Sequence, residues 1–265
     1  MPRFSANLSM LFAELPFLDR FGAAAGAGFR GVEYLFPYEY DATLLADRLG
    51  ENQLAQVLFN LPAGDWTSGE RGIACQPERR GEFQDGVGRA LEYAKALGCR
   101  QLNCLAGIPI GVSADTARET LVANLKFAAE ALERAQVRLL LEPINTRDVR
   151  GFFVPTSQQA LGIMKEVGAR NLWLQFDVYH AQVMEGDLAV SIGKSIERIA
   201  HFQIADNPGR HEPGTGEINF PFLLSFIDGL GYDGWIGCEY KPATTTMAGL
   251  KWLSNVRSVG RPEAS

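Results

Sequence analysis

The chain lacks the features that mark several common protein classes. No stretch approaches the roughly 18 consecutive apolar residues of a membrane span, and the N-terminus has one basic residue but no clean apolar segment of a signal peptide. Basic residues are outnumbered, with 25 Lys and Arg against 31 Asp and Glu, which gives a net charge of −6. An acidic surface disfavours nucleic acid and anionic membranes. We therefore expect a cytoplasmic protein with no nucleic-acid and no membrane partner.

Cysteine is scarce, and a nucleotide-binding glycine motif is missing. The four cysteines, Cys75, Cys99, Cys104 and Cys238, form no CxxC pair, and we interpret them as small buried side chains in a reducing compartment. No GxGxxG follows the first predicted strand, so nothing supports a dinucleotide-binding fold.

A repeated alternation of short apolar runs with amphipathic segments fills the 265 residues. The apolar runs predict eight strands, at 4–10, 28–35, 54–61, 100–107, 137–144, 171–179, 199–206 and 234–241. Strands that alternate with helices pair in parallel through right-handed crossovers, and eight such units in this length favour a closed (β/α)8 barrel, the TIM barrel. We expect an α/β fold with a single domain over 1–265, in which about 257–265 form a loosely ordered tail.

Helices are predicted between these strands. The patterns cover 15–26, 41–50, 81–97, 113–134, 157–167, 186–197, 220–229 and 244–254. Ser113 is expected to cap the helix that it begins, the helix at 157–167 is expected to begin at Ser157, and Gly98 is expected to end another helix. The longest irregular stretch, about 60–80, follows the third strand, and a loop of that length in a compact barrel typically forms a lid or a wall of the active site.

Oxygen-bearing side chains stand at the ends of four consecutive predicted strands. These side chains are Glu142, Asp177, Gln203 and Glu239. Active sites of such barrels lie at the carboxyl ends of the strands. Each residue alone is explained equally well as a hydrogen-bonded core group, but three carboxylates buried together are costly unless a cation neutralises them. Three carboxylates and an amide oxygen suit one divalent ion, Mg²⁺ or Mn²⁺.

Several long motifs resemble hydroxypyruvate isomerase, in the xylose-isomerase-like superfamily of TIM barrels. The resemblance covers nearly the whole chain and is carried by RFSANLSMLF (3–12), GFRGVEYLFPY (28–38), NLPAGDW (60–66), GERGIAC (69–75), LEPIN (141–145), HFQIADNPGRHEPGTGEIN (201–219) and GWIGCEYKP (234–242). It implies one divalent metal held by Glu142, Asp177, Gln203 and Glu239, with Glu142 and Glu239 as the catalytic pair that moves the proton. It also implies a place in glyoxylate metabolism.

The chemistry implied by this resemblance is an aldose–ketose isomerisation. Hydroxypyruvate and 2-hydroxy-3-oxopropanoate (tartronate semialdehyde) would interconvert by proton transfer through an enediolate, which a metal stabilises. In related keto-sugar epimerases a histidine takes the position of Gln203, so this chain departs from that wider pattern. The departure favours an all-oxygen site over a zinc site.

Five further residues are candidates for binding a small anionic keto acid. His180 follows Asp177 by three residues and is a candidate donor to a substrate oxygen. Lys241, Arg71 and Arg210 are candidate partners of the substrate carboxylate, and Lys241 would share the side of Glu239 if that strand continues. Trp66 is a candidate for closing over the substrate. The alternative interpretation is a solvated surface charge for each of the three basic residues, which explains them equally well, a capping or packing residue for His180, and an exposed loop anchor for Trp66.

Three alternative functions remain open at this point. A 2-oxo-tetronate isomerase keeps the chemistry and adds one carbon to the substrate, although NLPAGDWTSGERGIAC looks more like the hydroxypyruvate enzyme. An apurinic endonuclease of the same superfamily would need a histidine-rich multi-zinc site and a basic groove, against three histidines and a net charge of −6 here. A non-catalytic barrel would not need four intact strand-end ligands. A homo-oligomer is left open.

Overall fold

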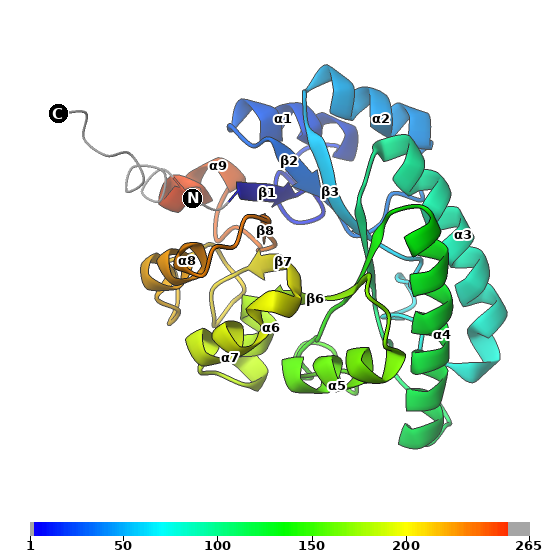
Figure 1. Ribbon diagram of the computed structural model, residues 1–265. Helices are drawn as coiled ribbons and strands as arrows, with labels where there is room; N and C mark the ends of the chain where they lie inside the picture. The colour runs from blue at the N-terminus through cyan, green and yellow to red at the C-terminus, as the bar shows by residue number, and fades with distance from the viewer. Residues whose placement is uncertain (1–2, 254–265) are drawn as a thin grey trace.

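A closed barrel of eight parallel strands forms the centre of the molecule, as the sequence predicts (Figure 1). The computed structural model describes residues 3–253, so the predicted tail at 257–265 lies outside the described residues. Each strand pairs with the next along the chain, and β8 closes on β1. The strands are β1 (Arg3–Asn7), β2 (Gly31–Glu33), β3 (Ala55–Asn60), β4 (Gln101–Cys104), β5 (Arg138–Leu141), β6 (Leu172–Asp177), β7 (Ile199–Ile204) and β8 (Trp235–Cys238).

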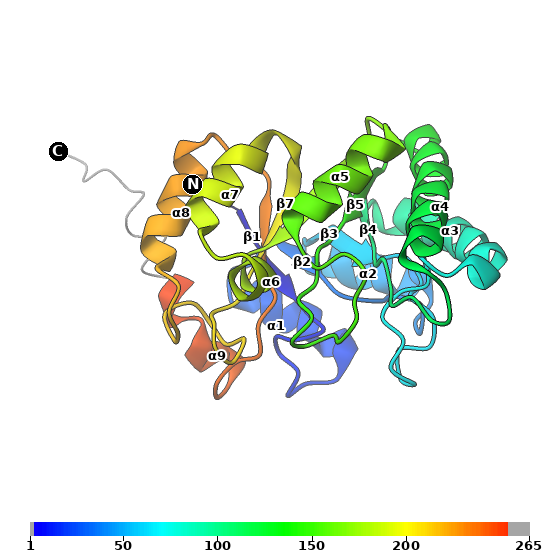
Figure 2. The ribbon, with the colours of Figure 1, turned by 90° about the horizontal axis from the view of Figure 1, so that it is seen from below.

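Helices form an outer layer around this barrel. The long pair α3 and α4 lie side by side on one flank, and α7 and α8 lie together on the opposite flank in Figure 2. The helices described are α1 (Arg20–Gly26), α2 (Ala42–Glu51), α3 (Arg80–Leu97), α4 (Ala114–Arg134), α5 (Ser157–Val167), α6 (Val178–Met184), α7 (Leu188–Ser195), α8 (Phe220–Gly229) and α9 (Thr246–Gly249). Short 3-10 turns lie at Phe17–Asp19, Pro77–Arg79 and Ile196–Arg198.

Local sequence explains where several helices start and stop. The side chain of Ser113 accepts a hydrogen bond from the backbone N–H of Thr116 and caps α4, as predicted. Gly98 ends α3 in the left-handed conformation with φ 63°. The helix expected at 157–167 begins at Ser157, as predicted. Thr156 caps α5, and the N–H and hydroxyl of Ser157 both donate to Glu185.

The sixth strand is shorter than predicted, and a helix that the apolar pattern hides follows it. Strand β6 ends at Asp177 rather than at residue 179, and α6 begins at Val178. The Asp177 carboxylate accepts hydrogen bonds from the backbone N–H groups of Tyr179 and His180, at 2.8 and 3.4 Å. This cap turns the chain into a helix while β-branched and aromatic residues still suggest a strand. The predicted helix at 15–26 likewise starts late, because α1 begins at Arg20.

Polar residues line the barrel interior toward the carboxyl ends of the strands. They recur at every second position of a strand and so point to the same side. The pairs are Ser5 and Asn7 on β1, Gln101 and Asn103 on β4, Gln175 and Asp177 on β6, and His201 and Gln203 on β7, all buried. Apolar side chains such as Phe176 and Phe202 take the alternate positions and pack toward the helices, at 5.8 Å between ring centroids.

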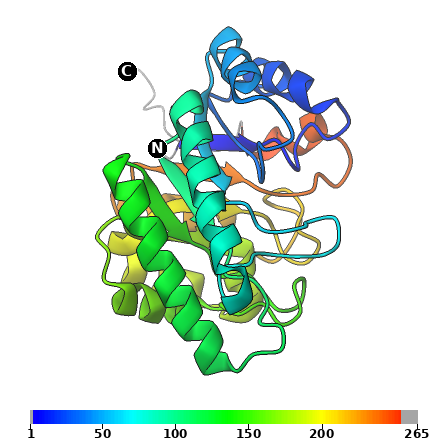
Figure 3. The same cartoon turned by 90° about the vertical axis from the view of Figure 1, so that its right-hand side faces the viewer.

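The connecting loops gather at one end of the barrel, on the right of Figure 3. Asp206 organises the loop that follows β7. Its two carboxylate oxygens accept hydrogen bonds from four backbone N–H groups at 2.8–3.1 Å, those of Asn207, Gly214, Gly216 and Ile218. A side chain that satisfies four backbone donors of one loop fixes the course of that loop.

Two expectations from composition meet the structure here. All four cysteines are buried thiols, in line with the interpretation as small core residues. Within residues 3–253, no helix combines the length and the apolar character needed to cross a bilayer.

Candidate active site

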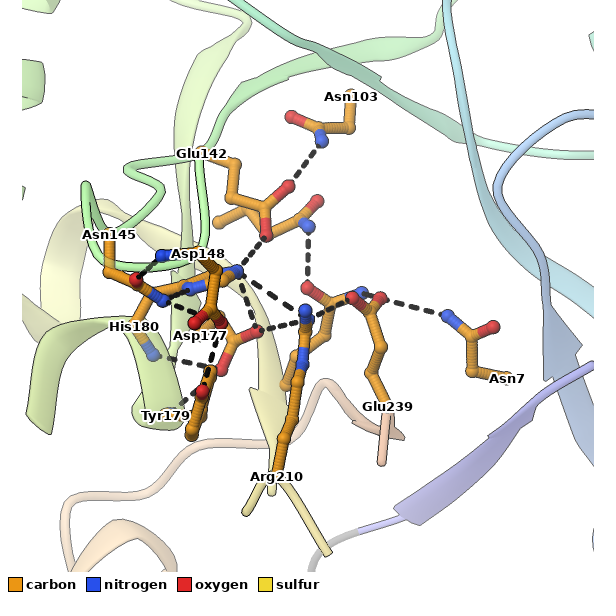
Figure 4. Close-up of polar contacts among 12 residues, drawn as sticks. Asn7, Asn103, Glu142, Asn145, Asp148, Asp177, Tyr179, His180, Arg210 and Glu239 are labelled. Atoms are coloured by element: carbon orange, nitrogen blue, oxygen red, sulfur yellow. Dashed lines mark hydrogen bonds and ion pairs between the residues drawn. The ribbon is translucent and has the colours of Figure 1, made fainter. Parts of the chain in front are cut away.

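The four residues predicted at strand ends lie together in the mouth of the barrel. Glu142 follows β5, Asp177 ends β6, Gln203 lies on β7 and Glu239 follows β8. Each is 5% exposed or less. Glu142, Asp177 and Glu239 converge on one space in Figure 4. The structure therefore brings these four side chains together at one rim of the barrel.

Amide side chains from the barrel interior hold the two glutamates in place. Asn103 donates to Glu142 Oε2 at 2.7 Å, and Asn7 donates to Glu239 Oε2 at 2.8 Å (Figure 4). Gln203 Nε2 also donates to Glu239, and its Oε1 accepts from Gln175 Nε2 at 2.7 Å. Both glutamates are thus oriented by donors on other strands, which leaves one oxygen of each toward the shared space.

Arg210 lies among the carboxylates. Its Nη2 donates to Glu239 Oε1 at 2.6 Å and to Asp177 Oδ2 at 3.4 Å, and its guanidinium stacks on the Tyr179 ring at 5.1 Å. Arg210 has a left-handed backbone with φ 57°, which is uncommon for a residue with a side chain. The Asp206 loop holds this conformation, since the Arg210 N–H donates to the Asp206 carbonyl oxygen at 3.0 Å. The loop therefore positions a cation in the site.

Burial and mutual repulsion raise the pKa of each carboxyl group. Burial is the largest cause for Glu142, repulsion by Asp177 adds to it, and together they raise the pKa of Glu142 to about 8. Burial also raises the pKa of Asp177 and raises that of Glu239 well above its ordinary value, although Arg210 opposes both shifts. Burial lowers the pKa of Arg210, but the carboxylates outweigh it and raise that pKa overall. The single positive charge of the Arg210 guanidinium therefore does not balance the three carboxyl groups of the cluster.

His180 lies beside Asp177 and Glu142. Its Nε2 is 3.5 Å from Asp177 Oδ2 and 3.9 Å from Glu142 Oε1. Burial and the nearby Arg210 lower the pKa of His180 well below its ordinary value, so the ring is neutral at neutral pH. On its other side, Nδ1 lies 2.6 Å from the Asn145 side-chain nitrogen. The structure therefore brings His180 into the site, as the sequence suggests.

The other predicted substrate-binding residues lie farther from the cluster. Lys241 is exposed, and β8 ends at Cys238, so the condition under which Lys241 would share the side of Glu239 is not met. Arg71 stacks on Trp66 at 4.0 Å and donates to the carbonyl oxygens of Trp66 and Glu70. Trp66 in turn packs edge-on against Phe36 at 5.1 Å. Of the three basic candidates, Arg210 is the one that contacts the carboxylates.

Glu33 is a site residue that the sequence analysis missed. Its carboxylate is 1% exposed, accepts from Ser5 Oγ at 2.7 Å and from Gln203 Nε2 at 2.9 Å, and lies 2.9 Å from His201 Nε2. Burial raises the pKa of Glu33, but His201 and these hydrogen bonds outweigh burial and lower it overall. The missed signal is the one that identified Glu142: a carboxylate within an apolar strand, here in GFRGVEYL.

The donor set fits a divalent cation. Oxygens of Glu142 and Asp177 and a ring nitrogen of His180 lie within 4.8 Å of one another. Arg210 already contacts two carboxylates as a cation would, yet the pKa values of all three remain raised. Mutual repulsion of this kind is relieved by a metal ion bound between the carboxylates. The buried cluster therefore suits a metal ion.

The fold and the site define the class to which the chain belongs. It is a member of the xylose isomerase-like TIM barrel family, whose model matches residues 21–256. A solved structure of a Brucella melitensis protein named AP endonuclease, family 2, superposes with a TM-score of 0.95 at 48% identity, over 96% of this chain and 99% of the other.

Relatives with established names narrow the class. The chain is 53% identical to hydroxypyruvate isomerase of Escherichia coli strain K12, over 97% of this chain and 100% of the relative. It is 52% identical to 2-oxo-tetronate isomerase of Cupriavidus necator, over 96% of this chain and 98% of the relative. At this level of identity over the full length, the chain is an isomerase of this kind.

Proposed function

We propose that the chain interconverts hydroxypyruvate and 2-hydroxy-3-oxopropanoate, with Glu142 and Glu239 as the catalytic pair. The observation that supports it most directly is the convergence of these two buried carboxyl groups, each oriented by its own amide donor, on a space that also contains Arg210. The identity to the Escherichia coli isomerase supports the choice of substrate.

The reaction moves two protons between adjacent atoms. One glutamate removes a proton from C3 of hydroxypyruvate, and a proton is returned to C2, while the C3 hydroxyl proton passes to the oxygen on C2. Each glutamate is held by an amide donor on one oxygen and can direct the other oxygen to the reacting carbons, as a group that accepts and returns a proton there must. Acid–base groups of this kind each contribute about 10²–10⁴-fold.

The other residues bind and orient the substrate. Arg210 is positioned to bind an anionic oxygen of the substrate, since its guanidinium already faces carboxylate oxygens. His180 lies close enough to donate to a second oxygen. Arg71 and Trp66 form part of the loop after β3, and we assign them to the wall that excludes water. Lys241 is assigned to the outer rim.

A divalent ion, Mg²⁺ or Mn²⁺, is the proposed cofactor. Glu142, Asp177, Gln203 and Glu239 would hold it through hard oxygen ligands from four neighbouring strands. For Gln203 this requires the side-chain amide to turn, because its Oε1 accepts from Gln175 and its Nε2 faces Glu239. When bound, it supplies the positive charge that stabilises the oxyanion of the enediolate. The proposal also places the enzyme in the cytoplasm, where such a small anionic keto acid would be its substrate.

The 2-oxo-tetronate isomerase activity is the second candidate, because a relative of that name is 52% identical over nearly the whole chain. One carbon in the substrate is a small difference for a loop-lined pocket. An endonuclease, the name of the Brucella protein, is disfavoured by the net charge of −6.

One experiment separates these functions. Metal-stripped protein is incubated with hydroxypyruvate or 2-oxo-tetronate, with and without Mg²⁺ or Mn²⁺. The 2-hydroxy-3-oxopropanoate formed from hydroxypyruvate is followed with a coupled reductase, and the four-carbon isomer formed from 2-oxo-tetronate is followed by chromatography. A duplex with an abasic site is incubated in parallel. Metal-dependent turnover of hydroxypyruvate in clear preference supports the proposal. Preference for 2-oxo-tetronate would identify that acid, and not hydroxypyruvate, as the substrate. Cleavage of the duplex without isomerisation of either acid overturns the proposal.

A further inference from the structure

We infer that Asn145 fixes the tautomer of His180, so that the ring presents an N–H and not a lone pair to the active site. His180 is then a hydrogen-bond donor to the substrate and is excluded from the set of metal ligands, while Asn145 is a positioning residue. The role toward substrate rests on the proposed function, but the tautomer itself does not.

The orientation of the Asn145 amide is determined by two neighbours of fixed polarity. The backbone N–H of Asp148 can only donate, and it lies 2.7 Å from Asn145 Oδ1. The Asp148 carboxylate can only accept when ionised, and its Oδ2 lies 3.2 Å from Asn145 Nδ2. Both contacts require the same assignment of oxygen and nitrogen, so an amide flip is excluded.

This orientation directs an amide N–H group toward the imidazole. Asn145 Nδ2 lies 2.6 Å from His180 Nδ1, and both residues are buried. Because an amide nitrogen only donates, Nδ1 must accept and carries no proton. The single proton of a neutral imidazole is then on Nε2.

The opposite edge of the ring faces the carboxylates and Arg210. His180 Nε2 lies 3.5 Å from Asp177 Oδ2, 3.9 Å from Glu142 Oε1 and 3.5 Å from Arg210 Nη2. A guanidinium only donates, but its contact with Nε2 is at the outer limit of a hydrogen bond, whereas Asn145 Nδ2 lies 2.6 Å from Nδ1, so the Asn145 contact decides the tautomer. On distance alone, the three residues form a candidate ligand set for a metal ion. A ligating histidine, however, needs a lone pair on that nitrogen, and it normally donates its other N–H to a carboxylate or a carbonyl. Here the other nitrogen accepts, so the hydrogen-bond polarity is that of a donor residue.

A second contact keeps Asp148 in place to impose this polarity. The Tyr179 hydroxyl donates to Asp148 Oδ2 at 2.8 Å, and Arg147 donates to the Tyr179 hydroxyl at 2.9 Å (Figure 4 shows Asn145, Asp148, Tyr179 and His180). Residues of the loop after β5 thereby set the chemistry of a ring on α6.

Nitrogen NMR of the full chain tests the tautomer without any substrate. The sequence has three histidines, so ¹⁵N-labelled protein gives three imidazole patterns, assigned with His180→Gln and His211→Gln. We expect His180 to show a protonated Nε2 and an unprotonated Nδ1 at neutral pH, both before and after addition of Mg²⁺ alone. An unprotonated Nε2, or loss of its proton when Mg²⁺ is added, overturns the inference.

An exchange of two neighbouring side chains reverses the polarity at constant net charge. In the double variant Asn145→Asp with Asp148→Asn, the new carboxylate at position 145 accepts a hydrogen bond from His180 Nδ1. The new amide at position 148 donates to that carboxylate. We expect the proton to move to Nδ1, turnover with Mg²⁺ to fall about 10–100-fold, and Zn²⁺ to bind more tightly, because a lone pair now joins Glu142 and Asp177. Asp148→Asn alone is the matched control and should keep the native tautomer.

The outcomes separate this inference from the proposed function. If the exchanged variant keeps a protonated Nε2, Asn145 does not set the tautomer, whatever the enzyme turns over. If the nitrogen pattern is as expected but hydroxypyruvate is not a substrate, the proposed function fails and the tautomer assignment stands. Should the double variant not fold, the pattern of the unmodified protein still decides the assignment.

Discussion

Glu142 and Glu239 are alike in type, burial and position, but different partners hold them. Glu239 contacts the guanidinium of Arg210 at 2.6 Å, whereas Glu142 accepts from the neutral amide of Asn103 at 2.7 Å. Two carboxyl groups with unequal neighbours can exchange the roles of acid and base within one reaction cycle. Their amides fix the direction of the reactive oxygens, so activity depends on the carboxyl groups themselves more than on the shape of the side chains.

Glu142→Gln and Glu239→Gln are each expected to lower kcat about 10²–10⁴-fold, because each removes one acid–base group while keeping its volume. Turnover of hydroxypyruvate is measured with saturating Mg²⁺, and circular dichroism confirms the fold. Glu119→Gln, at an exposed position of α4, serves as the control and should leave kcat unchanged. Near-normal turnover of either site variant would remove that glutamate from the catalytic pair.

The raised pKa of Glu142 makes the metal-free protein sensitive to pH. Its folded pKa of about 8 lies above its ordinary value of 4.5, so the folded state binds the proton more tightly than the unfolded state. This contribution to stability is complete below pH 4.5 and is lost as pH rises through 8. We expect the thermal midpoint in chelator to fall from pH 5 to pH 8, and calorimetry measures it. This decrease of the thermal midpoint should be smaller in Glu142→Gln. An equal decrease in that variant would show that other groups cause it.

At the scale of elements, strands and loops contribute different things to the site. Strand ends supply the carboxylates, and their positions follow from the parallel pairing, for instance Asp177 opposite Gln203 and Gln203 opposite Gly237. The loop after β7 supplies Arg210 and depends on Asp206 for its course. The strand-end carboxylates can therefore keep their positions in variants whose β7 loop no longer positions Arg210.

Asp206→Asn is expected to destabilise the protein by about 1–3 kcal/mol, because an amide offers one acceptor oxygen to backbone donors that now share two. It should also lower kcat/KM, since Arg210 loses its support. Chemical unfolding and steady-state kinetics measure the two effects. Asp85→Asn, exposed on α3, is the control. An unchanged kcat/KM would show that Arg210 is held by other contacts.

Gly237 is required by its neighbour across the barrel. A Cβ at this position would lie 2.2 Å from Glu33 Oε1, so Gly237→Ala must displace that carboxylate. We expect weaker Mn²⁺ binding by titration calorimetry, since Gln203 loses a partner. In a Glu33→Ala background the added methyl should cost no further affinity. Gly162→Ala, where nothing lies within 4 Å, is the matched control. A loss in the double variant beyond that of Glu33→Ala would contradict this account.

At the scale of the whole molecule, the repeated pattern of the sequence predicts the barrel and the rim at which the site lies. The periodicity of the sequence predicts the regular strands and helices. The four strand-end site residues can be recognised in the sequence because each interrupts an apolar run. Glu33 offers the same signal and was overlooked, whereas the contacts of Arg210 depend on a loop whose course follows from Asp206. The end of β6 was misplaced because a side-chain cap, not the apolar pattern, starts α6. The conformations of loops and helix caps depend on individual hydrogen bonds, and the periodicity of the sequence does not reveal these bonds.

Metal should stabilise the whole fold. An ion that binds only the folded state at 100 times its Kd adds about 2.7 kcal/mol to the free energy of unfolding. We expect Mg²⁺ or Mn²⁺ to raise the thermal midpoint of chelator-treated protein, as followed by differential scanning fluorimetry. The double variant Glu142→Gln with Asp177→Asn should lose this response. An equal rise in that variant would place the ion elsewhere.

The close fit of Glu33 against Gly237 also restricts how this barrel can change through descent. The two positions stand on strands that are distant along the chain, and position 237 cannot accept a side chain while Glu33 keeps its present place. A lineage that acquired a side chain at 237 would first have to give up the carboxylate at 33, and with it the partner of Gln203. Homologues that carry a side chain at position 237 should therefore lack the carboxylate at position 33.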